Sequence, residues 1–154
     1  MLQRKKLTRE QALQRSKIFC GYQERCHYET KQKLISFGLP RNEVEQILSE
    51  LIEEDYLNEE RFAAAFARGK FRIKGWGRIK IRYELRQKKV SDYCIKKAMN
   101  EIDEAEYIKT LDRLYEVKLG ELEQETDEVT KKRKAKDYLL QKGFELDLIM
   151  KKIS

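Results

Sequence analysis

Apolar residues recur along the chain at helical spacing, and the pattern predicts nine α-helices separated by short breaks. One clear case places Val44, Ile47 and Leu48 on a single face of an amphipathic helix. Capping residues, glycines and the single proline give the approximate bounds. Five predicted helices have both ends: from the cap Thr8 to about Gln23, from about Tyr28 to Phe37, from about Ala105 to Leu122, from Val129 to Gln141 and from about Leu146 to Ile153. For the other four only the start is predicted: near Arg41, at Asn58, after Gly75-Trp76-Gly77 and at the cap Ser91.

One segment, residues 78–85 (RIKIRYEL), has two interpretations. Its strict alternation of polar and apolar residues is the period of a β-strand. On a helix, at about 100° per residue, Trp76, Ile79 and Tyr83 instead share one face. A stripe of cations then lies beside them: Arg78, Arg82, Arg86 and Lys89. The period alone does not decide between strand and helix.

An internal repeat favours the helix. A shift of 51 residues places Lys31 on Arg82, and a further shift of 54 places both on Lys136. The same shifts align four sets of apolar residues: Leu34, Leu85 and Leu139; Leu39, Val90 and Phe144; Val44, Ile95 and Ile149; Leu48, Met99 and Ile153. The third copy, KRKAKDYLLQKGF, has a plain helical pattern, so residues 78–85 are predicted to be helical too.

A period near 50 residues indicates one supersecondary unit used three times. Chance alignment of amphipathic segments is the alternative. We therefore predict an all-α protein, an elongated tandem array of three three-helix repeats at residues 1–56, 57–102 and 103–154. Gly75 and Gly77 are predicted to let the chain turn sharply between the fourth and fifth helices.

Composition narrows the class of protein. Charged residues make up 40% of the 154 residues, well above an average domain, which suggests thin helical layers with much exposed surface. No apolar run is long enough for a leader or a membrane span, so we expect a cytoplasmic protein. The three cysteines are too few and too irregularly spaced for a disulfide framework or a zinc site, and we expect buried, reduced thiols.

No arrangement of residues indicates catalysis. His27 is the one histidine, and its neighbours in the sequence do not suggest a catalytic base. The cysteines have no evident histidine partner. Gly75-Trp76-Gly77 does not form a nucleotide-binding glycine motif. We predict no enzyme activity, no metal and no cofactor.

The positive charge is concentrated in residues 68–89. Ten of these residues are Lys or Arg and one, Glu84, is acidic, a local charge of +9 against +7 for the whole chain. Acid-rich segments, residues 41–66 and 101–128, bracket this basic centre. A basic stripe with aromatic residues among the cations is typical of a surface that meets phosphates or an acidic partner. A solvated helix face is the alternative. The candidate binding residues are Arg61, Lys70, Arg72, Lys74, Trp76, Arg78, Lys80, Arg82, Arg86, Lys88 and Lys89.

The Trp76 side chain has two possible roles. An indole beside cations could stack on a base or anchor an interface, whereas an aromatic residue at a helix start commonly fills a hydrophobic junction.

Residues 55–63 (DYLNEERFA), followed by Gly77-Arg78-Ile79 and Leu85-Arg86-Gln87-Lys88, resemble the RecX family of bacterial RecA modulators. The resemblance is strongest over residues 48–100. This chain has Lys89 where the family commonly has a glycine at the end of the fifth helix.

The resemblance implies a curved array that lies in the groove of a filament of RecA on single-stranded DNA and inhibits the recombinase, in DNA repair, recombination and the SOS response. Arg61, Arg78 and Arg86 become candidate contacts by this resemblance, although Arg61 could equally pair with Asp55 or a neighbouring glutamate. The expected partners are the RecA filament and, directly or through it, single-stranded DNA, bound by a monomer. A free-standing nucleic-acid-binding module and a helical scaffold for an acidic protein are the alternatives.

Overall fold

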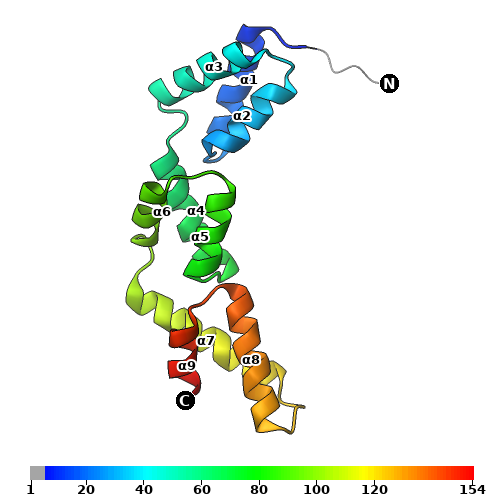
Figure 1. The fold of residues 1–154 in the computed structure, drawn as a ribbon, viewed down its shortest axis with the longest axis vertical. Helices are drawn as coiled ribbons and strands as arrows, with labels where there is room; N and C mark the ends of the chain where they lie inside the picture. The colour runs from blue at the N-terminus through cyan, green and yellow to red at the C-terminus, as the bar shows by residue number, and fades with distance from the viewer. Residues whose placement is uncertain (1–5) are drawn as a thin grey trace, which may run out of the picture.

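The computed structural model describes residues 6–154, which form nine α-helices and no strand. The helices are α1 (Arg9–Tyr22), α2 (His27–Ser36), α3 (Arg41–Glu53), α4 (Glu59–Lys74), α5 (Arg78–Gln87), α6 (Asp92–Met99), α7 (Glu104–Glu121), α8 (Glu128–Lys142) and α9 (Leu146–Ile153). Figure 1 shows them as three three-helix units stacked along an elongated body, with the α1–α3 unit at one end and the α7–α9 unit at the other. The all-α repeat architecture is therefore confirmed.

The helix ends follow the local signals. The Thr8 hydroxyl accepts a hydrogen bond from the Gln11 backbone N–H at 3.1 Å, and Asn58 caps α4 through the Arg61 N–H at 2.9 Å. Gly143 ends α8 in the left-handed region at φ 98°. Residues 78–85 are helical within α5, so the interpretation drawn from the repeat is confirmed and the strand interpretation is wrong.

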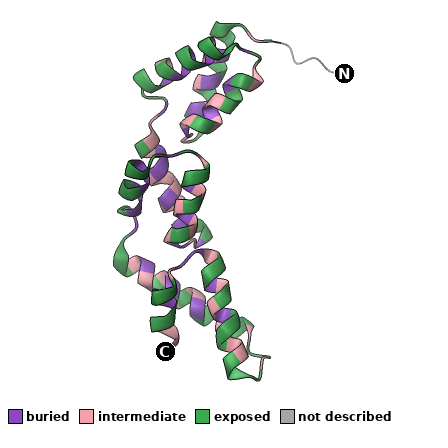
Figure 2. Cartoon of the chain, in the orientation of Figure 1, coloured by how far each residue is buried: buried purple, intermediate pink, exposed green. Residues whose placement is uncertain are grey.

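The repeat also predicts the core. The aligned leucines of α2, α5 and α8, Leu34, Leu85 and Leu139, are all fully buried. The apolar positions that follow them in the repeat, such as Val44 in α3 and Ile149 in α9, are buried as well, except Ile153, which is partly buried. Figure 2 shows the buried residues on the sides of the helices that face one another within each unit. All three cysteines are buried free thiols, as predicted.

The two glycines between α4 and α5 have different roles. Gly75 ends α4 at φ 68°, so its conformational freedom is used as predicted. Gly77 has φ −79°, which any residue can adopt. A Cβ atom there would lie 2.3 Å from the Gly143 carbonyl carbon, so close approach of another unit, and not a sharp turn, requires this glycine. The prediction is wrong for Gly77.

Lys89, at the position where the resemblance implies a glycine, has a left-handed backbone. Its φ is 62°, and the residues at the equivalent repeat positions, Gly38 and Gly143, have φ 84° and 98°. The helix boundary is thus retained in the left-handed region by a residue with a side chain.

Two hydrophobic clusters run through the body. The first lies within the α1–α3 unit and includes Leu57. The second spans the α4–α6 and α7–α9 units without a break, through ring contacts of Tyr107 with Phe71 at 5.7 Å and with Phe144 at 5.1 Å. The second and third units therefore share one core, which also includes Cys26 from the first unit.

At the junction of these two units, the end of α8 meets the start of α5. The Gly77 N–H donates to the Lys142 carbonyl at 2.7 Å, and the Ile79 N–H donates to the Gly143 carbonyl at 2.9 Å. Two backbone donors at the start of α5, those of the N-cap Gly77 and of Ile79, are thus satisfied by carbonyls at the C-terminal end of α8. The two helices are joined head to tail, and Figure 1 shows α8 (orange) below α5 on one side of the body.

Candidate nucleoprotein-binding surface

The structure divides the predicted binding residues into two chemical groups. Most of the arginines are held by carboxylates of neighbouring elements. The pairs are Arg61 with Glu24 (2.7 Å) and Asp55 (3.1 Å), Arg72 with Glu106 (3.6 Å), Arg78 with Glu145 (2.8 Å) and Glu104, and Arg86 with Asp92 (3.8 Å). Arg82 and the predicted lysines make no ion pair within residues 6–154.

Arg78 lies inside the junction and not on an exposed ridge. Its side chain is 14% exposed, and its guanidinium stacks 3.8 Å from the centre of the Tyr107 ring. Its backbone N–H donates to the Tyr107 hydroxyl, which in turn donates to Glu145. Burial lowers the pKa of Arg78, but the hydrogen bonds and charges of Glu145 and Glu104 more than offset this, and the net pKa is raised. Arg78 therefore joins the second and third units, and the sequence-based ridge loses this member.

Arg61 has a comparable position between the first two units. Besides its two carboxylate partners, it donates to the Asp55 carbonyl at 3.0 Å. Because Glu24 precedes α2 and Arg61 lies in α4, this pair connects the first unit to the second. The geometry thus favours the alternative in which Arg61 pairs with carboxylates of this protein over a contact with a partner.

The free lysines gather around two aromatic rings. Lys70 lies 5.0 Å from the centre of the Trp76 ring and 5.5 Å from that of Phe66, Lys80 lies 4.5 Å from Trp76, and Lys88 lies 5.9 Å from Phe66. We call these five residues the lysine–aromatic surface. Ammonium groups that neutralise no carboxylate are available to an anionic partner.

Trp76 packs against the core but keeps part of its surface exposed. Its ring meets the Phe66 ring edge-on at 6.3 Å, and both pack against the shared core of the second and third units. Trp76 is nevertheless only partly buried, and two ammonium groups lie over its ring. A rigid, half-buried indole flanked by cations is a suitable platform for a nucleobase.

A recess of about 370 Å³ continues this surface towards the first unit. Phe66, Lys70 and Lys88 line it on one side, and Glu24 and Glu29 on the other. Cations and acids thus face each other across the boundary between the first two units.

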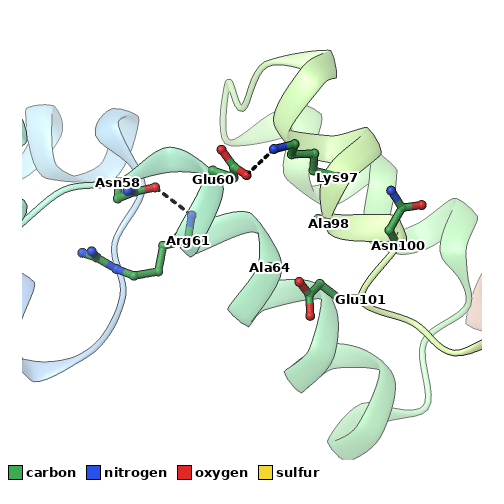
Figure 3. Close-up of a pocket in the computed structure, with 8 residues that line it drawn as sticks. All are labelled: Asn58, Glu60, Arg61, Ala64, Lys97, Ala98, Asn100 and Glu101. Atoms are coloured by element: carbon green, nitrogen blue, oxygen red, sulfur yellow. Dashed lines mark hydrogen bonds and ion pairs between the residues drawn. The ribbon is translucent and has the colours of Figure 1, made fainter.

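A second recess, of about 590 Å³, lies between α4 and the end of α6 (Figure 3). Ala64 and Ala98 contribute small side chains to it, and Glu60 pairs with Lys97 at 2.9 Å. Its other charged residues are also paired, Arg61 with Glu24 and Asp55, and Glu101 with Arg68. Because these charges are neutralised within the protein, this recess is a poorer candidate for an anionic partner.

The remaining predicted residues are placed as follows. Lys74 and Lys89 are exposed, and Arg82 is partly exposed on α5. Sequence reasoning missed Phe66 and Lys142, whose ammonium group donates to the Lys74 carbonyl at 2.6 Å across the junction. Lys142 carries no local signal, because only the docking of the third unit brings it to α4.

None of the helices in residues 6–154 combines the length and apolar character needed to cross a bilayer. The same residues hold no group of three or more His, Cys, Asp or Glu side chains placed to bind a metal.

Comparison with known proteins identifies the family. Residues 58–99 match the family model described as the second three-helix domain of RecX, and residues 104–153 match the third three-helix domain. The regulatory protein RecX of Pelodictyon phaeoclathratiforme is 32% identical over 117 residues, which cover 76% of this chain and 71% of that protein. The chain belongs to the RecX family.

Other relatives cover different shares of their own length. The regulatory protein RecX of Prosthecochloris aestuarii is 36% identical over 94 residues, 61% of this chain and 62% of that protein. For the Geobacillus kaustophilus protein the identity is 26% over 140 residues, 91% of this chain but 52% of the relative. The chain thus spans between about half and three quarters of these RecX proteins.

Solved structures share the fold. The crystal structure of RecX from Lactobacillus salivarius superposes with a TM-score of 0.84 over 94% of each chain, at 23% identity. A second crystal structure of a regulatory protein RecX gives 0.85 over 94% of this chain and 70% of that one, at 22% identity. The elongated three-unit architecture is therefore that of solved RecX proteins.

Proposed function

We propose that this protein is a non-catalytic regulator that binds the filament of RecA on single-stranded DNA and lowers recombinase activity. The chain belongs to a family whose members are named regulatory proteins, which supports a regulatory role for this protein. The observation that carries the proposal furthest is the lysine–aromatic surface, in which unpaired ammonium groups surround a half-buried indole within the unit that matches the second RecX domain.

The shape and charge distribution are consistent with a nucleoprotein partner. An elongated body can contact several subunits of a polymer, and it presents a basic centre between acidic segments. The units at 1–56, 57–102 and 103–154 would each provide part of this contact. Regulation would follow from occupancy alone, because a bound body that bridges subunits alters filament growth without covalent chemistry.

The direct test is the single-strand-dependent ATP hydrolysis of RecA, measured with increasing amounts of this protein. We expect hydrolysis to fall in a saturable manner. An unchanged rate at saturating amounts contradicts the proposal.

A charge-matched pair of variants tests the surface. Substitution of Lys70, Lys80 and Lys88 by Gln removes three unpaired cations, and we expect the concentration for half-maximal inhibition to rise at least about tenfold, since each lost contact weakens binding by roughly 0.5–1 kcal/mol. The control replaces Lys109, Arg113 and Lys151 by Gln, which removes the same charge from exposed positions of α7 and α9. Equal effects of the two triple variants would exclude the surface.

Trp76 gives an independent readout, because it is the only tryptophan in the chain. Its fluorescence is expected to change on filament binding and to stay constant on addition of RecA without DNA. If the Trp76 fluorescence does not change when the filament is added, the contact does not involve Trp76.

A further inference from the structure

Helix α8 carries a second group of cations. Five of the six residues at 131–136 are Lys or Arg. Of these, Lys134 pairs with Glu125 at 3.1 Å, whereas the other four form no ion pair within residues 6–154. Lys132 and Arg133 are exposed and Lys136 is partly exposed. The lysine–aromatic surface, on which the proposed function mainly rests, does not include these residues.

The α8 cations have counterparts on α5. Lys136 occupies the repeat position of Arg82, three residues before the buried leucines Leu139 and Leu85. Lys132 lies one turn before Lys136 on the same flank of its helix. Both helices therefore present cations on the same flank relative to their buried leucines.

The junction joins the two helices end to end. The hydrogen bonds from Gly77 and Ile79 to the last carbonyls of α8 hold the helices head to tail. Their 15 and 10 residues give a combined length of about 37 Å at 1.5 Å per residue. Because the second and third units also share a core, the distance between the α8 and α5 cations is fixed.

Positive charge also gathers at the junction itself. Burial lowers the pKa of Lys142, and the nearby charges of Lys80 and Lys74 lower it further. A bound phosphate would relieve this repulsion. The exposed ring of Tyr83 on α5 adds a surface on which a base could stack.

We propose that α8 and α5 form one continuous cationic face, the α8–α5 face, that binds the phosphate backbone of a single nucleic-acid strand across the junction of the second and third units. The inference rests on the proposed function and assigns the nucleic-acid contact within it. Several cations on two helices joined end to end suit a repeating phosphate chain better than a compact acidic site on a protein.

The test is direct binding of a fluorescently labelled oligothymidylate, without RecA, followed by anisotropy over a series of salt concentrations. Substitution of Lys132, Arg133 and Lys136 by Gln should reduce the slope of log affinity against log salt by about 2, since each single-strand phosphate contact contributes about 0.7. Affinity at low salt should fall at least about tenfold. The control is again Lys109, Arg113 and Lys151 replaced by Gln, which should leave the slope unchanged.

Each outcome decides a different point. An unchanged slope in the α8 variant, or no binding of the oligothymidylate by the wild-type protein, overturns the inference. Loss of RecA inhibition by the α8 variant with intact oligothymidylate binding also overturns it, because α8 would then contact protein, while the proposed function stands. A reduced slope in a protein that leaves RecA unaffected upholds the α8–α5 face and refutes the proposed function.

Discussion

Substitution of Gly77 by Ala should separate the second and third units. A Cβ atom at this position would lie 2.3 and 2.4 Å from the carbonyl carbon and oxygen of Gly143 and 2.5 Å from the Phe144 nitrogen. All three are backbone atoms, so no flexible side chain can move away. The φ of −79° suits alanine, and the expected effect is therefore steric and local to the junction.

The magnitude follows from the contacts that must open. Moving the two units apart breaks the hydrogen bonds from the Gly77 and Ile79 backbones, each worth about 1 kcal/mol net and up to about 3 kcal/mol if a buried donor is left without a partner. The smaller backbone entropy of alanine in the unfolded chain returns about 0.5–1 kcal/mol. We expect the free energy of unfolding to fall by about 1–5 kcal/mol.

Urea unfolding followed by far-ultraviolet circular dichroism and by Trp76 fluorescence measures this effect, since the indole is adjacent to the substituted residue. Gly69→Ala is the matched control. A Cβ at Gly69 meets nothing within 4 Å, and alanine inside α4 should stabilise by roughly 0.5–1 kcal/mol. A Gly77→Ala protein as stable as the wild type would refute the close-approach explanation.

Three further predictions concern single contacts. Lys89→Gly should raise the free energy of unfolding in urea by about 0.5–1 kcal/mol, because glycine relieves the left-handed backbone at φ 62°; a loss of stability would argue against strain there. Tyr107→Phe should cost about 1–3 kcal/mol at neutral pH through its lost hydrogen bonds. Burial and the hydrogen bond to Glu145 raise the pKa of Tyr107 above its ordinary value of 10.0, so the wild type loses stability above that pH as the unfolded tyrosine ionises, and its advantage over Phe should shrink there; a constant difference would contradict this assignment. For Arg61 and Glu24, which are each about one third exposed, a double-mutant cycle in urea should give a coupling of only about 0.5–1 kcal/mol, and a coupling near zero would remove this pair as a connection between units.

The structural surroundings of the candidate binding residues could be predicted from the sequence for the lysines but not for all of the arginines. The five lysines predicted in residues 68–89 make no ion pair within residues 6–154, which agrees with the scarcity of acids in that part of the sequence. The charge pattern misplaced Arg78, whose partners Glu104 and Glu145 come from distant segments. It also gave no indication of Lys142, which approaches Lys74 only when the third unit docks.

The sequence alone determined the helices and their repetition, since caps, breakers and apolar spacing act over a few residues. The left-handed glycines and the aligned buried leucines followed from the same local information. Tertiary structure decided which cations remain unpaired, why Gly77 must lack a side chain, and that α8 continues into α5. These depend on contacts between units far apart in the chain, and a periodic pattern specifies that each unit has a buried face but not which atoms of the next unit will meet it.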